Sequence, residues 1–143
     1  MSDDYRLLIT GSRKATPEML DYARRAVARA KEHGWHIVVG DAEGVDLAVM
    51  QACDALGVPY VCYGIDPQPR HGNPAQYVRC EGTFLDRDRV MARICHRVLA
   101  IWNGHSQRSG TIATWNYARN DHKPGELVNF GKPDNPIHHV RET

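Results

Sequence analysis

The sequence has none of the bulk features that would place it in a membrane or give it a strong charge. No stretch approaches the roughly 18 apolar residues of a membrane span. The 18 basic and 17 acidic residues nearly cancel, for a formal net charge of +1. The net charge therefore gives no indication that the protein binds nucleic acid. The start, residues 1–5, is polar and acidic, unlike a signal peptide. We expect a cytoplasmic protein without membrane association.

Familiar site motifs are also missing. There is no GKS or GKT, so no Walker A loop, no GxGxxG fingerprint of a dinucleotide cofactor, and no GxSxG elbow. The four cysteines form no CxxC pair, and the eight histidines lack the spacing of metal ligands. We predict no metal and no cofactor, and we expect core or half-buried free thiols.

Length and composition fit one compact domain. The 143 residues, 42% of them apolar, suffice for one hydrophobic core and are too few for two domains. We predict a single domain over residues 1–143, with its core at about 6–130 and a loose tail over 131–143, where Pro133 and Pro136 lie.

Short apolar runs alternate with segments of helical periodicity. Strands are expected at 6–10, 35–39, 59–63, 98–102 and 127–130. Helices are expected to begin at Thr16, Val45, about Asp86 and Thr111. The Pro- and Gly-rich stretch 64–74 is expected to be a long loop. Strict alternation predicts an α/β, Rossmann-like three-layer fold with a mainly parallel sheet of about five strands.

Three glycine-centred loops stand at the ends of three of these apolar runs. They are residues 10–13 (TGSR), 40–46 (GDAEGVD) and 109–111 (SGT). In a parallel sheet such loops meet at the carboxyl edge of the strands, where ligands bind and backbone N–H groups can approach an anion. A nucleotide or another phosphorylated small molecule is therefore the leading ligand hypothesis.

The first and third loops carry the features of a phosphate site. Backbone amides and small hydroxyls at a helix start suit an anion, and the Arg13 guanidinium can grip phosphate with two hydrogen bonds. A plain turn and ordinary helix capping remain the alternatives. The candidate ligands here are Gly11, Ser12, Arg13, Ser109, Gly110, Thr111 and Thr114.

The second loop adds carboxylates. Asp46 falls in the first turn of a helix, where it caps amides or accepts hydrogen bonds from a ribose hydroxyl. Asp41 lies inside a glycine loop that needs no carboxylate to fold. Both are candidates for catalysis. The binding candidates of this loop are Gly40, Asp41, Ala42, Gly44 and Asp46.

Two arginines and one tryptophan complete the candidate site. Arg87 and Arg89 approach the same edge from the helix before the fourth strand, either as ligand contacts or as part of a solvated basic face. Trp102 ends that strand, where it either stacks on a base or packs in the core.

Together the loops resemble the SLOG superfamily, which includes the "Lonely guy" phosphoribohydrolases and the DprA/Smf proteins. Residues 10–13 look like the GSR of the DprA and YspA branches, and 40–46 are similar to their G-x-A-x-G-x-D loop. Residues 87–91 resemble the YspA pattern of Arg-Asn, two residues, then Met, and 109–111 match the SGT or SGS that opens the last helix. The likeness spans about residues 6–130 and is greatest to the YspA-like (cpYpsA-related) branch. Asp88 stands where that pattern has asparagine.

The resemblance implies a nucleotide or nucleotide-derived ligand, in a sensor or processing module. It also implies a homodimer or higher homo-oligomer, and the helix from Thr111, with Ile112, Trp115 and Tyr117, adds apolar surface that suits one. One alternative is a hydrolase acting on an N-glycosidic or phosphoribosyl bond. However, the phosphoribohydrolase glutamate is replaced by Thr114, so such activity would need Asp41 or Asp46. A second alternative is single-stranded nucleic acid binding related to DprA.

Overall fold

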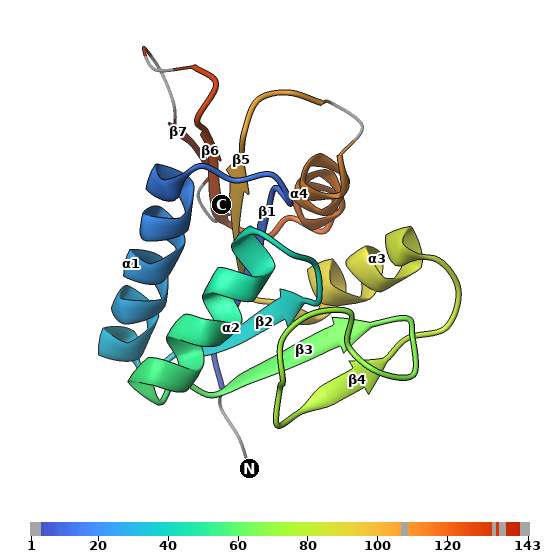
Figure 1. Cartoon of the computed structure of the whole chain (residues 1–143). Helices are drawn as coiled ribbons and strands as arrows, with labels where there is room; N and C mark the ends of the chain where they lie inside the picture. The colour runs from blue at the N-terminus through green and yellow to red at the C-terminus, as the bar shows by residue number, and fades with distance from the viewer. Residues whose placement is uncertain (1–3, 107–108, 133, 135–136, 141–143) are drawn as a thin grey trace.

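The computed structural model describes residues 4–106, 109–132, 134 and 137–140, and one sheet crosses it (Figure 1). The strands are β1 (Arg6–Gly11), β2 (His36–Gly40), β3 (Tyr60–Gly64), β4 (Tyr77–Arg79), β5 (Arg97–Trp102), β6 (Gly125–Asn129) and β7 (Ile137–Val140). Their order in the sheet is β4-β3-β2-β1-β5-β6-β7. Strands β1 to β6 are parallel, and β7 is antiparallel to β6.

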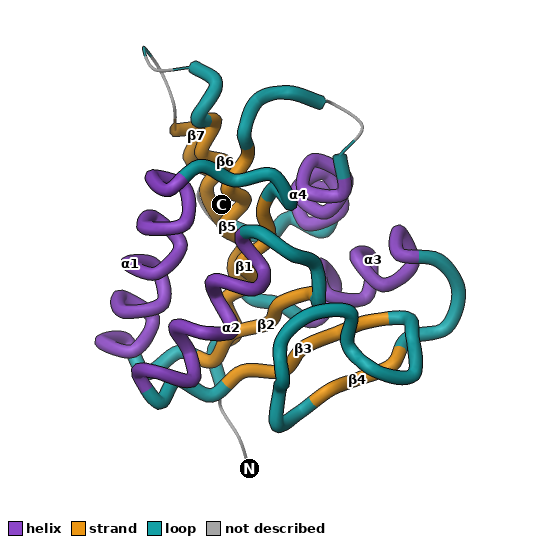
Figure 2. Tube along the Cα trace, in the orientation of Figure 1, coloured by secondary structure: helices purple, strands orange, loops and turns teal. Residues whose placement is uncertain are grey.

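Four helices cover the two faces of this sheet. They are α1 (Pro17–His33), α2 (Val45–Leu56), α3 (Phe84–Ile94) and α4 (Gly110–Asn120). Helices α1 and α2 pack together on one face, and α3 and α4 pack together on the other (Figure 2). Side chains alternate along β1: Leu7 and Ile9 join the core under α1 and α2, while Leu8 joins the core under α3 and α4. The three-layer α/β prediction is confirmed.

Local signals place the helix ends as the sequence indicated. Thr16 caps α1 by accepting a hydrogen bond from the Met19 amide at 3.3 Å, and Pro17 opens the helix. Gly34 closes it in the left-handed region, at φ 70°. Helix α3 begins two residues before the expected Asp86, because Thr83 and Asp86 form a reciprocal capping box.

Two strands were not predicted. Strand β4 has only three residues, of which Val78 and Arg79 are exposed, so it has no buried face to create an apolar pattern. Strand β7 lies in the segment expected to be a loose tail, and that expectation is wrong for residues 137–140, which pair with β6. The reading of 64–74 as a loop holds, since no helix or strand lies between β3 and β4.

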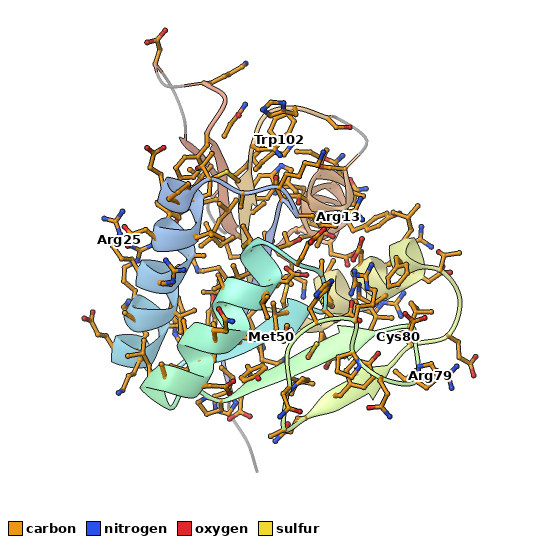
Figure 3. All side chains as sticks on the ribbon, in the orientation of Figure 1. Arg13, Arg25, Met50, Arg79, Cys80 and Trp102 are labelled. Carbon is orange, nitrogen blue, oxygen red and sulfur yellow. The ribbon has the colours of Figure 1, made fainter. Side chains whose placement is uncertain are left out.

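Burial decides between a core role and a surface role for several residues that the sequence left open. Ile112 and Trp115 are 7% and 6% exposed, so the apolar surface offered as a hint of a dimer is mostly used inside the monomer. Trp102 is 5% exposed, so it packs in the core rather than offering a face to a base (Figure 3). Cys53, Cys62 and Cys95 are buried free thiols, as expected, and Cys80 is half-buried. None of the described helices is long and apolar enough to cross a membrane.

The strand order sets the position of the site. The chain runs outward from β1 through β2 and β3 to β4, then crosses to β5 on the other side of β1. Loops after β1 and β5 therefore leave the sheet in opposite directions. In open α/β sheets the crevice at this reversal, at the carboxyl ends of the strands, is the usual ligand site.

Candidate ligand-binding cleft

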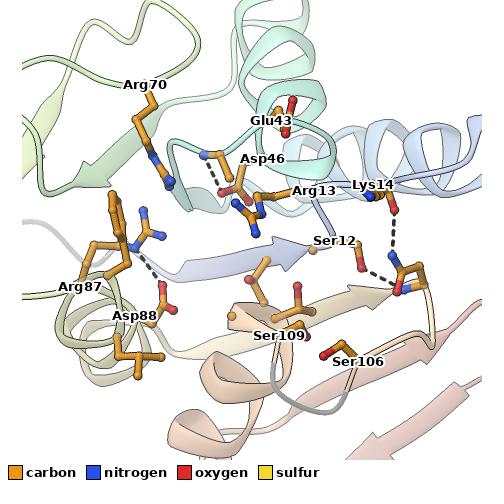
Figure 4. Close-up of a pocket in the computed structure, with 18 of the residues that line it drawn as sticks. Ser12, Arg13, Lys14, Glu43, Asp46, Arg70, Arg87, Asp88, Ser106 and Ser109 are labelled. Atoms are coloured by element: carbon orange, nitrogen blue, oxygen red, sulfur yellow. Dashed lines mark hydrogen bonds and ion pairs between the residues drawn. The ribbon is translucent and has the colours of Figure 1, made fainter.

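A cleft of about 690 Å³ opens at this reversal point (Figure 4). Its walls come from the loops after β1, β2, β3 and β5 and from the starts of α3 and α4. The predicted residues that line it are Gly11, Ser12, Arg13, Ala42, Asp46, Arg87, Ser109, Gly110 and Thr111. Gly40, Asp41, Gly44, Arg89 and Thr114 are not among the lining residues.

Hydrogen bonds fix the loop after β1 at Ser12, whereas the side chain of Arg13 makes none with the described residues. The Ser12 amide donates to the Ile101 carbonyl at 3.0 Å, and the buried Ser12 hydroxyl accepts from the Asn103 amide at 2.9 Å. These bonds tie the loop to the end of β5. Arg13 is exposed, and its guanidinium has no hydrogen-bond or ion-pair partner among the described residues. Its side chain points into the cleft in Figure 4.

Glycines let the first two loops touch. Gly44 has φ 76°, and a Cβ there would collide with the carbonyl oxygen of Arg13. A Cβ on Gly11 would come within 2.5 Å of the Val45 side chain. The Val45 amide donates to the Ser12 carbonyl at 3.2 Å across this contact. The glycines at 11 and 44 thus join the loops, and only Gly11 also borders the cleft.

Asp41 does not face the cleft. Its carboxylate is fully buried and accepts three hydrogen bonds from Arg70: from the amide (3.0 Å), from Nε (3.0 Å) and from Nη2 (2.8 Å). Arg87 Nη1 lies 3.2 Å from the same carboxylate. Burial alone would raise the pKa of Asp41, but the bonds from Arg70 and the charge of Arg87 outweigh it and lower that pKa. In this conformation Asp41 links Arg70 and Arg87 inside the protein and is not placed to contact a sugar in the cleft.

Two glycines leave room for this network. A Cβ on Gly40 would fall 2.7 Å from Asp46 Oδ2 and 2.8 Å from Arg87 Nη1. A Cβ on Gly64 would collide with the Tyr77 hydroxyl and lie 2.8 Å from Asp41 Oδ2. Gly40 is a binding candidate of the second loop, but in the structure its neighbours are the buried charges of Asp46 and Arg87.

Arg87 is the centre of the buried charges. Its Nε donates to Asp88 at 2.8 Å and its Nη1 donates to the Tyr63 carbonyl at 2.9 Å, in addition to the pair with Asp41. Only 6% of the residue is exposed, although it borders the cleft. Burial raises the pKa of Asp88, against the lowering effects of Arg87 and Thr114. These bonds use the N–H groups of Nε and Nη1, whereas those of Nη2 have no partner among the described residues, so Arg87 can still donate hydrogen bonds into the cleft.

Asp46 is one of three carboxylate residues that line the cleft, with Glu43 and Asp88. It is 6% exposed and lines the cleft; Oδ2 accepts from the Ala42 amide at 3.2 Å, and Oδ1 has no hydrogen-bond partner among the described residues. Burial raises the pKa of Asp46 to about 7, against the lowering effects of Arg87 and the Ala42 amide. Near neutral pH this group can accept or donate a hydrogen bond.

The third loop opens α4 toward the cleft. Ser109 caps the helix by accepting from the Ile112 amide at 3.2 Å. Gly110 and Thr111 border the cleft at the first turn, where helical N–H groups have no partner within the helix. Thr114 is fully buried and donates to the Gly110 carbonyl at 2.8 Å. The position that resembles the site of the phosphoribohydrolase glutamate thus lies below the cleft surface.

Arg89 is not brought to the site. It is exposed, its guanidinium carbon lies 4.8 Å from the centre of the Tyr117 ring, and its Nη2 lies 3.5 Å from that hydroxyl. Because Arg87 and Arg89 are two residues apart on α3, they point to different sides of the helix. Arg87 thus lines the cleft, whereas the position of Arg89 fits the alternative of a solvated basic face.

Several lining residues gave no sequence signal. Arg70 lies in the Pro- and Gly-rich loop, and Asn103 and His105 follow β5 without any glycine motif. Phe84 and Leu85 precede the predicted start of α3. The only usable clue was adjacency: residues at the carboxyl end of a strand reach the ligand edge. The lining residues outside the predicted site are Thr10, Lys14, Glu43, Arg70, Phe84, Leu85, Asp88, Met91, Asn103, His105 and Ser106.

Comparisons with known proteins give a family match over part of the chain and solved structures with the same fold. Residues 2–63, from before β1 to within β3, match the family described as DNA recombination-mediator protein A. This segment contains the first two glycine loops. No curated protein was found to match by sequence.

Solved structures share the fold at low identity. The molybdenum cofactor binding protein of Rippkaea orientalis is 18% identical with a TM-score of 0.77, over 90% of this chain and 78% of that one. The molybdenum cofactor carrier protein of Chlamydomonas reinhardtii is 20% identical with a TM-score of 0.73, over 85% and 74%. DNA processing protein A of Helicobacter pylori, described with a single-stranded DNA binding mode, is 20% identical with a TM-score of 0.65, over 85% and 63%. The matches support the resemblance to the SLOG and DprA-like superfamily; the YspA-like branch stays a prediction.

Proposed function

We propose that the cleft binds a nucleotide or another small phosphorylated molecule and acts as a sensor or processing module. The observation that carries the proposal is that the unpaired cation of Arg13 and the open first turn of α4 border one cleft. A helix start with free N–H groups favours an anion, and a nearby guanidinium adds a charge-assisted contact. Lys14, exposed on the same rim, adds positive charge.

The remainder of the ligand would meet Asp46. Its free Oδ1 borders the cleft between the loop after β1 and the start of α3, so it suits a ribose hydroxyl or an amino group. Of the two carboxylates considered for this role, Asp41 is engaged by Arg70 and Arg87, which leaves Asp46.

The named ligands of the structural neighbours fit the same chemistry. Two neighbours are named for the molybdenum cofactor, which carries a phosphate group as a nucleotide does. We therefore include phosphorylated pterins among the candidates. Single-stranded DNA is the second candidate, favoured by the match of residues 2–63 and by the DNA processing protein A structures. Because Trp102 is buried, any stacking on a base would need another residue.

A panel of ligands separates these functions. The protein is incubated with nucleoside mono-, di- and triphosphates, a phosphorylated pterin and a single-stranded oligonucleotide. Thermal shift reports binding, and chromatography reports products. Stabilisation by a small phosphorylated compound without turnover supports the proposal. Release of a free base supports the hydrolase alternative, and retention of the oligonucleotide alone supports the DNA alternative.

The oligomeric state is a separate proposal. We infer a homodimer from the superfamily resemblance alone. The apolar surface of α4 no longer supports it, because Ile112 and Trp115 are mostly buried in the monomer. Light scattering at high micromolar concentration tests it, and a mass near 16.1 kDa would contradict it.

A further inference from the structure

We propose that the cleft contains a second subsite, formed by Phe84 and Leu85 at the start of α3, that holds a flat heterocyclic ring of the ligand. The inference rests on the proposed function, because the ring subsite is paired with a phosphate seat at the loop after β1 and the start of α4. It assigns the ligand class as a phosphorylated heterocycle rather than a phosphosugar or free phosphate.

Leu85 is the first observation. It is 50% exposed, and it lines the cleft beside Phe84 and Met91. Among the described residues, the other large exposed hydrophobic side chain is Val78, at 41%, which lies on strand β4 and does not line the cleft. A single exposed leucine on an open surface is ordinary. Here it forms part of an apolar wall inside a charged cleft.

Phe84 is held in place from within the protein. The guanidinium of Arg70 lies 3.9 Å from the centre of the Phe84 ring, and that of Arg87 lies 5.2 Å away. Both arginines are fixed by hydrogen bonds to Asp41. Arg70, which also lines the cleft, contributes a planar cation of the kind that stacks on rings. The surface around Phe84 is thus arranged before any ligand arrives.

The size and polarity of the cleft point to a ligand with two unlike ends. Figure 4 shows Arg87 and Asp88 on one side of the cleft and Ser12, Lys14 and Ser106 on the other. A phosphate group has only five heavy atoms, whereas a cleft of about 690 Å³ is in the range that takes a drug-sized molecule. A phosphate at the Ser12 side leaves the α3 side, where Phe84 and Leu85 provide apolar surface beside Arg87 and Asp88, for a flat ring that carries polar substituents. Asp46 lies between them with a free oxygen for an amino or hydroxyl group.

The test compares two probes that differ only by the ring. Adenosine monophosphate and ribose 5-phosphate are titrated into the parent protein, Leu85→Ser and the matched control Val78→Ser. We expect adenosine monophosphate to bind the parent more tightly than ribose 5-phosphate. Leu85→Ser should weaken the binding of adenosine monophosphate by about tenfold, because the adenine ring loses an apolar contact. The same substitution should leave the dissociation constant of ribose 5-phosphate unchanged. Val78→Ser should change the dissociation constant of neither probe.

The outcomes separate the subsite from the phosphate seat. If both probes bind the parent equally and Leu85→Ser alters neither, the ring subsite is wrong while the phosphate seat stands. If neither probe binds the parent, the proposed function fails and the subsite with it. If Leu85→Ser changes the mass in light scattering but not the ratio of the two dissociation constants, Leu85 serves a protein interface and the inference is overturned.

Discussion

The carboxylate of Asp41 accepts hydrogen bonds from both the main chain and the side chain of Arg70, which lies 29 residues later in the chain. This contact anchors the loop between β3 and β4 to the end of β2. It also sets the guanidinium of Arg70 over Phe84, on the wall of the cleft. This pair of a buried carboxylate and a partly exposed arginine thus fixes part of the cleft wall.

Asp41→Asn should lower the free energy of unfolding by about 3 kcal/mol, because it leaves Arg87 buried with one carboxylate partner fewer and releases the Arg70 loop. Denaturant unfolding measures the change. The control is Asp21→Asn, which removes an exposed pair with Arg25 and should cost about 0.5 kcal/mol or less. Equal effects of the two substitutions would show that the Asp41 network contributes no more than a surface pair.

Gly44→Ala should destabilise the protein more than Gly34→Ala. Gly34 lies in the left-handed helical region, at φ 70° and ψ 24°, where alanine has a backbone strain of about 1–2 kcal/mol. Gly44 has φ 76° and ψ −124°, outside that region and in a conformation that favours glycine, so alanine is strained there too. The added methyl group at 44 also collides with the Arg13 carbonyl, whereas at 34 it meets nothing within 4 Å. Thermal unfolding of the two variants compares the combined cost of backbone strain and loop contact at 44 with the cost of backbone strain alone at 34. The same loss of Tm in both variants would mean that this close approach does not matter.

Arg13→Ala should weaken binding of a phosphorylated ligand by roughly 1.5–3 kcal/mol if the guanidinium makes a charge-assisted pair. Stability should be unchanged, because Arg13 has no ion-pair partner among the described residues. Calorimetric titration gives the dissociation constant. Arg25→Ala, an exposed arginine on α1, is the control and should bind normally (Figure 3). An unaltered dissociation constant in Arg13→Ala would show that Arg13 is a solvated surface residue that does not contact the ligand.

Asp46→Asn should change the pH dependence of stability. The folded pKa of Asp46 is about 7, above the ordinary value near 3.9, so the folded state holds this proton over that interval and the unfolded state does not. Stability from this group is therefore present at low pH and is lost as pH rises from about 4 to 7. Asparagine mimics the protonated form, so the variant should gain stability relative to the parent across that window.

Asp46→Asn should also bind a phosphorylated ligand more tightly than the parent does at pH values where Asp46 is ionised. An ionised Asp46 repels a phosphorylated ligand, so the dissociation constant of the parent divided by that of Asp46→Asn should rise as pH passes through about 7. Taking the ratio cancels the ionisation of the ligand. A ratio that is flat between pH 5 and 9 would place Asp46 away from the bound phosphate.

We predict that adenosine monophosphate is not hydrolysed to adenine. Thr114 is fully buried with its hydroxyl on the Gly110 carbonyl, so no anion stands at that position to stabilise charge developing on the ribose. Thr114→Glu should destabilise the fold, because it would bury a second carboxylate near Asp88. Chromatography of a long incubation tests activity. Adenine release that disappears in Asp46→Asn would establish the hydrolase alternative.

The sequence predicted the elements that bury a repeating apolar face. Strand β1 and helix α1 carry both the periodicity and clear end signals, such as Thr16 and Gly34. Strands β4 and β7 could not be predicted, since β4 exposes most of its residues and β7 follows prolines in a short terminal segment. The edge that carries the glycine loops followed from topology alone.

Most of the predicted residues that line the cleft lie in or next to a glycine loop, and Arg87 on α3 is the exception. Arg13, Asp46 and Gly110 line the cleft as expected. Asp41 does not, because its partner Arg70 comes from a distant loop with no local signal. Contacts of this kind depend on the tertiary arrangement of buried charges, which no single segment encodes.

Backbone amide shifts on titration with adenosine monophosphate test the central claim most directly. The account predicts that the largest ¹H–¹⁵N changes fall on the amides of residues 12–14 and 110–112, which border the proposed phosphate seat. These changes should be strongly reduced in Arg13→Ala. Changes confined to another surface, such as the smaller cavity of about 150 Å³ beside Trp35 and Arg97, or no changes at millimolar ligand, would contradict it.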